Sequence, residues 1–376
     1  MNRKKASLII ATLIVVLAAG CTSTPTVQDP PARPSASPAI SSTATPAASR
    51  VPEALSDKVD AYLNERHFSG SVLLAKHGQV LVRKGYGLAN HSEELPNDPS
   101  TIFRIGSVTK QFTALAIMQL QEQGKLDVQD VVHAYLPDYP HGDQITIHHL
   151  LTHTSGIPNF TAFSDFLSTM DQPVTVEQNM DKFKDMPLNA EPGGVFSYSN
   201  SGYIVLGAII EQVSGQLYGE YLDEHIFKPL GMKDSGIRDG ELTDPQYAEG
   251  YMGNQSGIPS LPIDMSVPYA AGAMHSTVDD LYKWLQALQT EQLIGKSSAD
   301  VMFTPFKNGY AYGWGVLDAD RQIYGHNGGI NGFAAIVILG VQDHMTVIVL
   351  SNSEETAIDE IGNELGMMLA RSSEGE

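Results

Sequence analysis

The residue pair best suited to chemistry in this sequence is Ser107 and Lys110, which form an S-x-x-K pattern. On a helix, positions i and i+3 share a face, so the hydroxyl and the amine should be neighbours. A serine hydroxyl is a poor nucleophile at neutral pH, but an adjacent amine can take its proton when burial lowers the lysine pKa. Because the apolar run 112–118 follows, we expect the pair at the start of a buried helix, whose free N–H groups would stabilise an oxyanion. An N-capping serine beside an exposed lysine is the alternative interpretation.

A second polar group, Tyr198 and Asn200, precedes an apolar helix expected over 201–213. A phenol has an ordinary pKa of about 10, and we expect a lysine cation beside it to lower that pKa enough for proton relay. The amide of Asn200 can both donate and accept hydrogen bonds. A buried tyrosine followed by a helix-capping asparagine would give the same pattern.

The third group lies in the glycine-rich stretch 324–332, which we expect to join two late strands. Glycines such as Gly328 let a substrate backbone approach closely, as at a strand edge. His326 offers a ring N–H and is mostly neutral at neutral pH. A glycine-rich hairpin with a surface histidine is the alternative.

The elements that must position these groups are strands at both ends of the sequence and helices between them. A helical middle region is expected over 127–300. Outside it we expect helices over 53–68 and 355–371, and strands over 70–76, 79–84, 312–317, 333–339 and 346–350. This order predicts an α+β fold, with one antiparallel sheet built from the N- and C-terminal segments, flanked by helices, and an inserted mainly helical lobe.

The N-terminus carries a targeting signal rather than fold. Residues 1–20 combine a basic start with an apolar run, and Cys21, the only cysteine, follows a small-residue cleavage site. We therefore expect lipidation of Cys21, a disordered Pro/Ser/Thr/Ala tether over 21–50 and a folded domain over 51–376. The protein is therefore expected to be an exported lipoprotein that is anchored to the membrane of the cell envelope. An ordinary cleaved signal peptide and an uncleaved anchor are the alternatives.

The charge of the chain and the lack of certain motifs argue against several other classes of protein. A formal net charge of −20 disfavours nucleic acid and anionic headgroups as partners, so the membrane should be reached only through the lipid. His149 and His153 are four apart but lack an H-E-x-x-H arrangement, so we expect no metal and no cofactor, with His153 making structural hydrogen bonds at a turn. No serine has glycine at both −2 and +2, which argues against an α/β-hydrolase elbow.

The three groups, in this order, resemble the motifs of the serine β-lactamase and penicillin-binding protein superfamily. The likeness covers nearly all of 51–376 and is strongest to the branch of class C β-lactamases, D-aminopeptidases, D-Ala-D-Ala carboxypeptidases and related esterases. It implies a β-lactamase/transpeptidase-like fold, an α/β sandwich beside a helical lobe. The roles it implies are an acylated nucleophile at Ser107, a base and proton relay at Lys110 and Tyr198, substrate contacts at Asn200, His326 and Gly328, and an oxyanion hole formed by the N–H groups of Ser107 and Gly329.

One departure from the family pattern bears on the substrate. The sequence has no K-T-G, and the neutral His326 stands where class C enzymes have a lysine suited to a substrate carboxylate. This argues against strong β-lactamase activity. We therefore expect an exported serine hydrolase that acts on D-amino-acid peptides and amides of the cell wall. Short-chain ester hydrolysis, weak β-lactam hydrolysis and a penicillin- or peptide-binding lipoprotein without turnover remain alternatives, and the oligomeric state is open.

Overall fold

A computed structural model describes residues 53–237, 246–253 and 257–372 of the chain. The predicted signal peptide over 1–20, Cys21 and the tether over 21–50 lie outside these described residues. Within the described ranges, no helix combines the length and the apolar character needed to cross a membrane.

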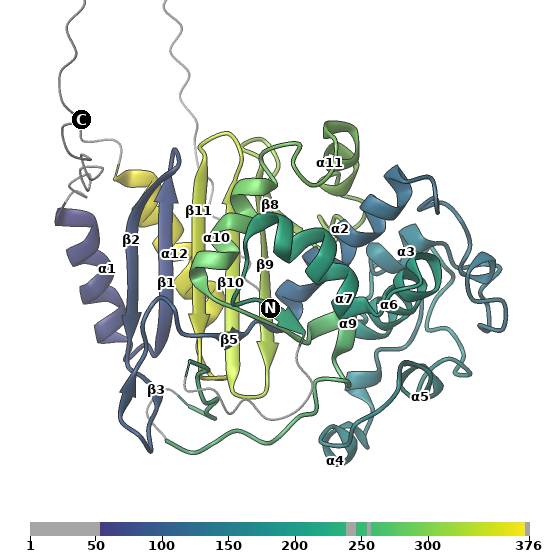
Figure 1. The fold of residues 1–376 in the computed structure, drawn as a ribbon, viewed down its shortest axis with the longest axis horizontal. Coiled ribbons are helices and arrows are strands. Elements are labelled where there is room, and N and C mark those ends of the chain that lie inside the picture. The colour runs from purple at the N-terminus through teal and green to yellow at the C-terminus, as the bar shows by residue number, and fades with distance from the viewer. Residues whose placement is uncertain (1–52, 238–245, 254–256, 373–376) are drawn as a thin grey trace, which may run out of the picture. The chain divides into compact units, whose positions relative to one another are not determined.

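The centre of the fold is a six-stranded sheet in which every neighbouring pair of strands is antiparallel (Figure 1). Its strands, in spatial order, are β2 (Gln79–Tyr86), β1 (Gly70–Lys76), β11 (Met345–Ser351), β10 (Phe333–Gly340), β9 (Ile323–Ile330) and β8 (Gly315–Asp318). The N-terminal hairpin pairs with the C-terminal strands, with Val72 opposite Val349. The predicted α+β architecture, with a sheet built from both ends of the sequence, is therefore confirmed.

Helices cover both faces of this sheet, which explains why its central strands read as continuous apolar runs. Alternate residues point to opposite faces. Val72 and Leu74 pack towards α1 (Glu53–Glu65) and α12 (Ile358–Arg371), whereas Leu73 belongs to the core on the side of α10 (Val278–Ala287) (Figure 1). Every residue of β10 and β11 is buried as a result.

The middle of the sequence supplies helices and two small sheets. The helices are α2 (Thr109–Glu122), α3 (Ile147–Leu151), α4 (Phe166–Thr169), α5 (Val176–Asp181), α6 (Asn200–Ser214), α7 (Tyr218–Leu222), α8 (Lys228–Leu230), α9 (Tyr269–Gly272) and α11 (Lys296–Met302). Single turns are η1 (Gly106–Val108), η2 (Val132–Ala134), η3 (Phe160–Ala162) and the π turn η4 (Asp223–Phe227). The small sheets pair β3 (Leu88–Asn90) with β4 (Leu95–Pro96), and β5 (Phe103–Arg104) with β7 (Met274–Ser276) and β6 (Gly236–Ile237), in that order.

Helix α2 is the packing centre of this helical region. It is buried from its first residue to Leu120 and packs against α6 and α9. A helix that is apolar around most of its circumference is stable only inside a core. The first turn of α2 is therefore held from several sides, which fixes the position of any side chain that it carries.

The largest difference from the sequence predictions is the glycine-rich stretch. We expected 324–332 to be a connection, but most of it forms strand β9, paired with β10 from Ile323 to Ile330. Glycine has low β propensity, so the local pattern was misleading, and pairing with the strongly apolar β10 overrides it. The strand expected over 312–317 also begins later, as β8 at Gly315.

Candidate active site

Ser107 lies in the single turn η1, which joins β5 to α2. The α-helix itself begins at Thr109, so the serine precedes it. The Thr109 hydroxyl donates to the carbonyl of Gly106 at 2.7 Å and ties the turn to the helix. Ser107 and Lys110 still meet as their spacing predicts, because 3₁₀ and α turns both return the chain to one face after about three residues.

Two glycines let strand β9 lie directly against this turn. A Cβ atom on Gly328 would lie 2.0 Å from the carbonyl oxygen of Ile105 and 3.0 Å from the amide nitrogen of Ser107. Gly106, at a φ of +51°, would place a Cβ 2.9 Å from the amide nitrogen of Gly329. The turn and the strand are therefore at backbone contact distance, which side chains would prevent.

Two of the predicted site residues contact the Ser107 hydroxyl. Lys110 Nζ lies 2.9 Å from Ser107 Oγ, and the Tyr198 hydroxyl donates to the same oxygen at 2.9 Å. Tyr198 lies 91 positions further along the chain, in the coil before α6. The structure thus brings together the three residues that the sequence analysis grouped.

The Lys110 amine is completely buried, and its hydrogen-bond partners are uncharged. Besides Ser107, they are Asn200 Oδ1 at 2.8 Å and the Ala271 carbonyl oxygen of α9 at 2.7 Å. Burial holds the pKa of Lys110 well below the ordinary lysine value, because the ammonium loses its hydration. A neutral amine has two N–H groups for the two acceptor-only oxygens and one lone pair for the Ser107 hydroxyl. The geometry therefore suits a base that takes the proton of Ser107.

Asn200 is held in the orientation that this arrangement needs. Its Nδ2 donates to Thr161 Oγ1 at 3.2 Å, and its backbone N–H donates to Asn159 Oδ1 at 3.0 Å. The amide oxygen is therefore turned towards Lys110. Asn200 is the first residue of α6, not a residue of the preceding loop as we expected.

Tyr198 is partly buried, and burial raises its pKa, with the hydrogen bond to Ser107 opposing the shift. Our prediction that a neighbouring cation lowers this pKa is therefore wrong, since burial also disfavours the cation on Lys110. Tyr198 stays protonated and can act as a proton donor. Its ring lies 4.1 Å from that of His153, whose Nδ1 accepts from the Ser199 N–H at 3.2 Å, so His153 has a structural contact beside the site.

His326 lies within β9 and is buried, so it is not a surface residue of a hairpin. Its Nδ1 donates to the carbonyl of Asn327 at 2.5 Å, so its Nε2 carries no proton and accepts from the Tyr310 hydroxyl at 2.9 Å. Burial lowers the pKa of His326 to about 4, and the nearby Lys110 adds to the shift. The imidazole is therefore neutral at neutral pH.

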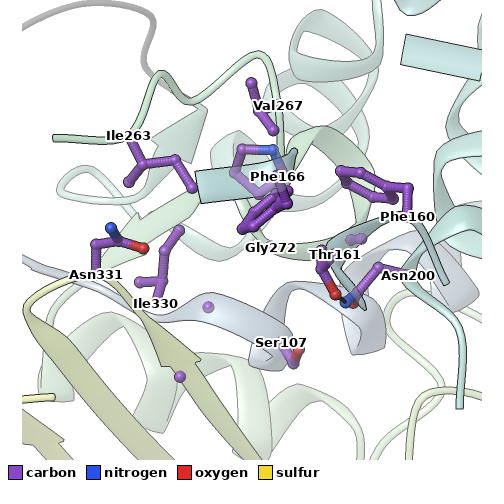
Figure 2. A pocket seen from close by; sticks show the side chains of 14 residues that line it. Ser107, Phe160, Thr161, Phe166, Asn200, Ile263, Val267, Gly272, Ile330 and Asn331 are labelled. Carbon is purple, nitrogen blue, oxygen red and sulfur yellow. Dashed lines mark hydrogen bonds between the residues drawn. The ribbon is translucent and has the colours of Figure 1, made fainter. Parts of the chain in front are cut away.

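A cavity of about 180 Å³ opens beside Ser107, and we call it the Ser107 cavity (Figure 2). Its apolar side chains come from three separate segments and are Phe160, Phe166, Ile263, Val267, Pro268, Ala271 and Ile330. Thr161, Asn200 and Asn331 add uncharged polar groups, and none of the described residues that line it is charged. Such a cavity fits an uncharged, mainly apolar group placed next to the serine.

The predicted site residues divide between this cavity and a second one. Asn200 and Gly329 line the Ser107 cavity, whereas Tyr198 and His326 line a cavity at the junction of β8 and β9. Gly328 lines neither cavity and lies against Ile105. Substrate contact by Gly328 and an oxyanion hole formed with the Gly329 N–H stay predictions.

The two histidines of α3, His148 and His149, form hydrogen bonds within the protein. The His149 ring accepts from the backbone N–H of Thr146 at 3.2 Å and completes the N-terminal cap of α3. His148 Nδ1 lies 2.7 Å from the Tyr312 hydroxyl. In the described ranges, no three His, Cys, Asp or Glu side chains gather in a way that could hold a metal ion.

Two contacts of the site were missed from the sequence. The carbonyl of Ala271 carries no residue-specific signal, since every residue has one. Tyr310, the partner of His326, lies outside the glycine-rich motif, in a bridge to Gly315. Both contacts depend on tertiary packing, so no local pattern marks them.

Comparison with known proteins supports one family. The beta-lactamase family model matches residues 55–370. The putative penicillin-binding protein PbpX of Bacillus subtilis is 35% identical over 315 residues, which cover 83% of this chain and 78% of that protein. Among solved structures, a penicillin-binding protein from Bacillus halodurans has a TM-score of 0.73 at 28% identity, covering 84% of this chain and 99% of its own. The D-amino acid amidase of Ochrobactrum anthropi SV3 has a TM-score of 0.76 at 26% identity, covering 87% and 100%. The chain therefore belongs to the beta-lactamase family, within the superfamily of serine β-lactamases and penicillin-binding proteins.

Proposed function

We propose that this protein hydrolyses amide or peptide bonds of D-amino-acid substrates of the cell wall through an acyl-enzyme on Ser107. The observation that carries the proposal is the double contact of one hydroxyl oxygen. Ser107 Oγ lies 2.9 Å from the buried Lys110 amine and 2.9 Å from the protonated Tyr198 hydroxyl. A nucleophile placed between a base and a proton donor is the arrangement that acyl transfer needs.

The proposed chemistry uses these groups in sequence. Lys110 takes the proton of Ser107 as Oγ attacks the substrate carbonyl, and the N–H groups of Ser107 and Gly329 stabilise the oxyanion. Tyr198 then gives its proton to the leaving nitrogen, and the Lys110 ammonium returns the proton to Tyr198. In deacylation the steps run in reverse: Tyr198 takes a proton from the attacking water as it passes its own proton to Lys110, and the Lys110 ammonium then returns a proton to Ser107 Oγ.

The proposed substrate class rests on the Ser107 cavity and on similarity. The cavity accommodates an apolar side chain beside the serine, and its polar edge carries Asn200 and Thr161. The D-amino acid amidase of Ochrobactrum anthropi SV3 has also been solved in complex with D-phenylalanine, and that structure is similar to this chain at 25% identity and a TM-score of 0.74. An aromatic D-amino acid is thus a ligand of that relative, and we propose apolar D-amino acids as acyl groups for this chain.

Ester hydrolysis is the second candidate, and one observation favours it. The free amine of a D-amino-acid amide is cationic at neutral pH, but none of the described residues lining the Ser107 cavity is acidic. A simple apolar acyl ester needs no such partner. The two candidates share the acyl-enzyme and differ only in the leaving group and in the charge of the acyl group.

Export as a lipoprotein is proposed with this activity. The basic and apolar residues 1–20, followed by Cys21, support it. Metabolic labelling with a radioactive fatty acid in a bacterial host should label the wild-type protein and not Cys21→Ala. Equal labelling of both would remove the lipoprotein proposal without affecting the hydrolase.

The test of the hydrolase is a substrate panel on the purified domain. The panel contains D- and L-phenylalanine p-nitroanilides, a D-Ala-D-Ala peptide, p-nitrophenyl esters and nitrocefin, with Ser107→Ala and the matched surface variant Ser92→Ala. We expect turnover of a D-amide that Ser107→Ala abolishes and Ser92→Ala retains, at unchanged thermal stability. Turnover by Ser107→Ala would exclude the proposed nucleophile. A stable Ser107 adduct that forms but never releases would identify a binding protein instead of an enzyme.

A further inference from the structure

The second cavity, at the junction of β8 and β9, carries an inference about the leaving group. We call it the Tyr198 cavity; it has a volume of about 420 Å³. Its lining comes from the site itself, from β8 and from α12, and consists of Tyr198, Tyr310, Gly315, Leu317, Gly325, His326, Asn327, Ile336, Asp359 and Asn363. Strand β8 pairs with β9 only as far as Gly325, so the described strands leave the outer edge of β9 beyond that point without a neighbour.

The position of Tyr198 relates this cavity to the reaction. Its hydroxyl contacts Ser107 Oγ, and the same side chain lines the Tyr198 cavity. The Ser107 cavity does not include Tyr198 in its lining. The proton donor of the proposed mechanism must face the leaving group, which places the leaving group towards the Tyr198 cavity and the acyl group in the Ser107 cavity. This step rests on the proposed function.

The charge of the Tyr198 cavity is negative. Asp359, in the first turn of α12, is the only charged side chain among the described residues that line it. Both of its carboxylate oxygens accept from Asn327 Nδ2 at 2.9 Å, which holds the carboxylate at the edge of β9. Successive residues of a strand point to opposite faces, so the carboxylate lies on the face that α12 covers and the His326 ring on the other. His326 is itself neutral, because its burial disfavours the cation.

No cation is available there to offset Asp359. The Lys110 amine is buried and already directed at three oxygens, so it cannot reach out to a substrate carboxylate. Among the described lining residues there is no lysine or arginine. A leaving group that ends in a free carboxylate would therefore meet a like charge and no partner, which disfavours its binding.

We propose that Asp359 determines leaving-group specificity, so that the enzyme accepts uncharged or cationic leaving groups and discriminates against those that bear a free carboxylate. The natural substrate is then an amide or an internal bond of a peptide, not a bond to a C-terminal D-amino acid. Asp359 acts on the substrate by charge alone. It takes no part in proton transfer, since Lys110 and Tyr198 supply both proton steps.

The test uses two esters with the same N-acetyl-D-phenylalanyl group, one of D-lactate and one of D-lactamide. They differ only in the charge of the leaving group, and esters report on Ser107 whether or not amides are cleaved. We expect the wild-type enzyme to prefer the lactamide ester about threefold in kcat/KM, because Asp359 is exposed and water screens its charge. Asp359→Asn should bring the ratio of the two values to about one, Asp359→Lys should invert it, and added salt should reduce it.

The matched control is Glu360→Gln. Glu360 is adjacent in the same first turn, but its carboxylate pairs with Arg66 at 3.0 Å and does not line the Tyr198 cavity. Both acids interact with the N-terminus of α12, so both substitutions should lower the melting temperature slightly. Only the Asp359 variants should change the substrate ratio.

The outcomes separate the two proposals. Equal turnover of both esters by the wild-type enzyme, or a ratio that Asp359→Asn leaves unchanged, would overturn the role of Asp359 and leave the acyl-enzyme on Ser107 standing. The same change of ratio in Glu360→Gln would also overturn it, because the effect would then come from overall charge. If neither ester is turned over in a Ser107-dependent manner, the hydrolase proposal fails, and the specificity proposal fails with it.

Discussion

The substitution Asn200→Asp tests whether the buried Lys110 is the base. It keeps the shape of the side chain and replaces the amide oxygen, 2.8 Å from Lys110 Nζ, with a carboxylate oxygen. A base must be neutral to accept the proton of Ser107, so the acylation rate rises with pH through the pKa of Lys110. Burial lowers that pKa in the wild-type enzyme, and a neighbouring negative charge must raise it.

The size of the shift follows from the contact. Two unit charges at 2.8 Å attract by about 6 kcal/mol at an effective dielectric constant near 20, which corresponds to about four pKa units. Burying the new carboxylate offsets part of this gain. We therefore expect the acidic limb of the pH–rate profile to move up by about two units, with acylation slowed about a hundredfold on that limb and recovered in alkaline buffer.

The assay is the second-order rate constant of acylation by a p-nitrophenyl ester, measured from about pH 5 to about pH 10. Asn200→Ala is the control, because it removes the same acceptor without adding charge. It should lower the rate without moving the limb upward. An Asn200→Asp limb at the wild-type position would show that the group titrating in acylation is not Lys110, and the proposed base would have to be abandoned.

Three further predictions concern stability and the acyl group. First, the pKa of His326 is about 4 in the folded protein and about 6.5 in the unfolded chain. As the pH falls between these values, the free energy of unfolding should therefore decrease by about 3 kcal/mol. In urea titrations at both pH limits, His326→Asn should lose about 3 kcal/mol less than the wild-type protein, and equal losses would contradict this prediction. Second, Gly328→Ala should lower the melting temperature and the acylation rate, because the new Cβ would lie 2.0 Å from the Ile105 oxygen. Gly329→Ala should leave the melting temperature unchanged, because its Cβ would have no atom within 4 Å. Equal melting temperatures for the two variants would contradict the close packing of β9 against the turn. Third, Phe166→Ala should reduce kcat/KM about tenfold for an aromatic acyl ester and little for an acetyl ester, and an equal loss for both would exclude the Ser107 cavity as the acyl site.

Much of the fold could be predicted because its information is local. The alternation and apolar runs of β1, β10 and β11 are long, and each strand lies where the pattern predicted it. The glycine-rich stretch could not be assigned in this way. Gly328 belongs to a strand because β10 pairs with it and because Ile105 requires a residue without a side chain there, and both causes lie elsewhere in the sequence.

In the candidate site, too, some features could be predicted from local sequence and others depend on tertiary packing. Ser107, Lys110, Tyr198 and His326 could be grouped because their types and order form motifs, and the structure places them together. The direction of the Tyr198 pKa shift was predicted wrongly, since burial is a tertiary property and its effect exceeds that of the hydrogen bond to Ser107. Asp359 had no motif, and only the packing of α12 against β10 and β11, together with the hydrogen bond from Asn327, brings it to the Tyr198 cavity.

One physical cause connects the protonation states around Ser107. Burial is the largest cause of the pKa shifts of Lys110, His326 and Tyr198, and in each it favours the neutral form. The resting site therefore holds no charge in contact with the serine. In the proposed mechanism, the only new negative charge that accompanies proton transfer to Lys110 is the oxyanion on the substrate, so each charge is stabilised chiefly by the other and only in the transition state. A resident carboxylate next to Lys110 would stabilise the ammonium before the reaction begins. It would thus remove the difference between ground state and transition state from which the rate acceleration comes, and for this reason an asparagine, not an aspartate, suits position 200.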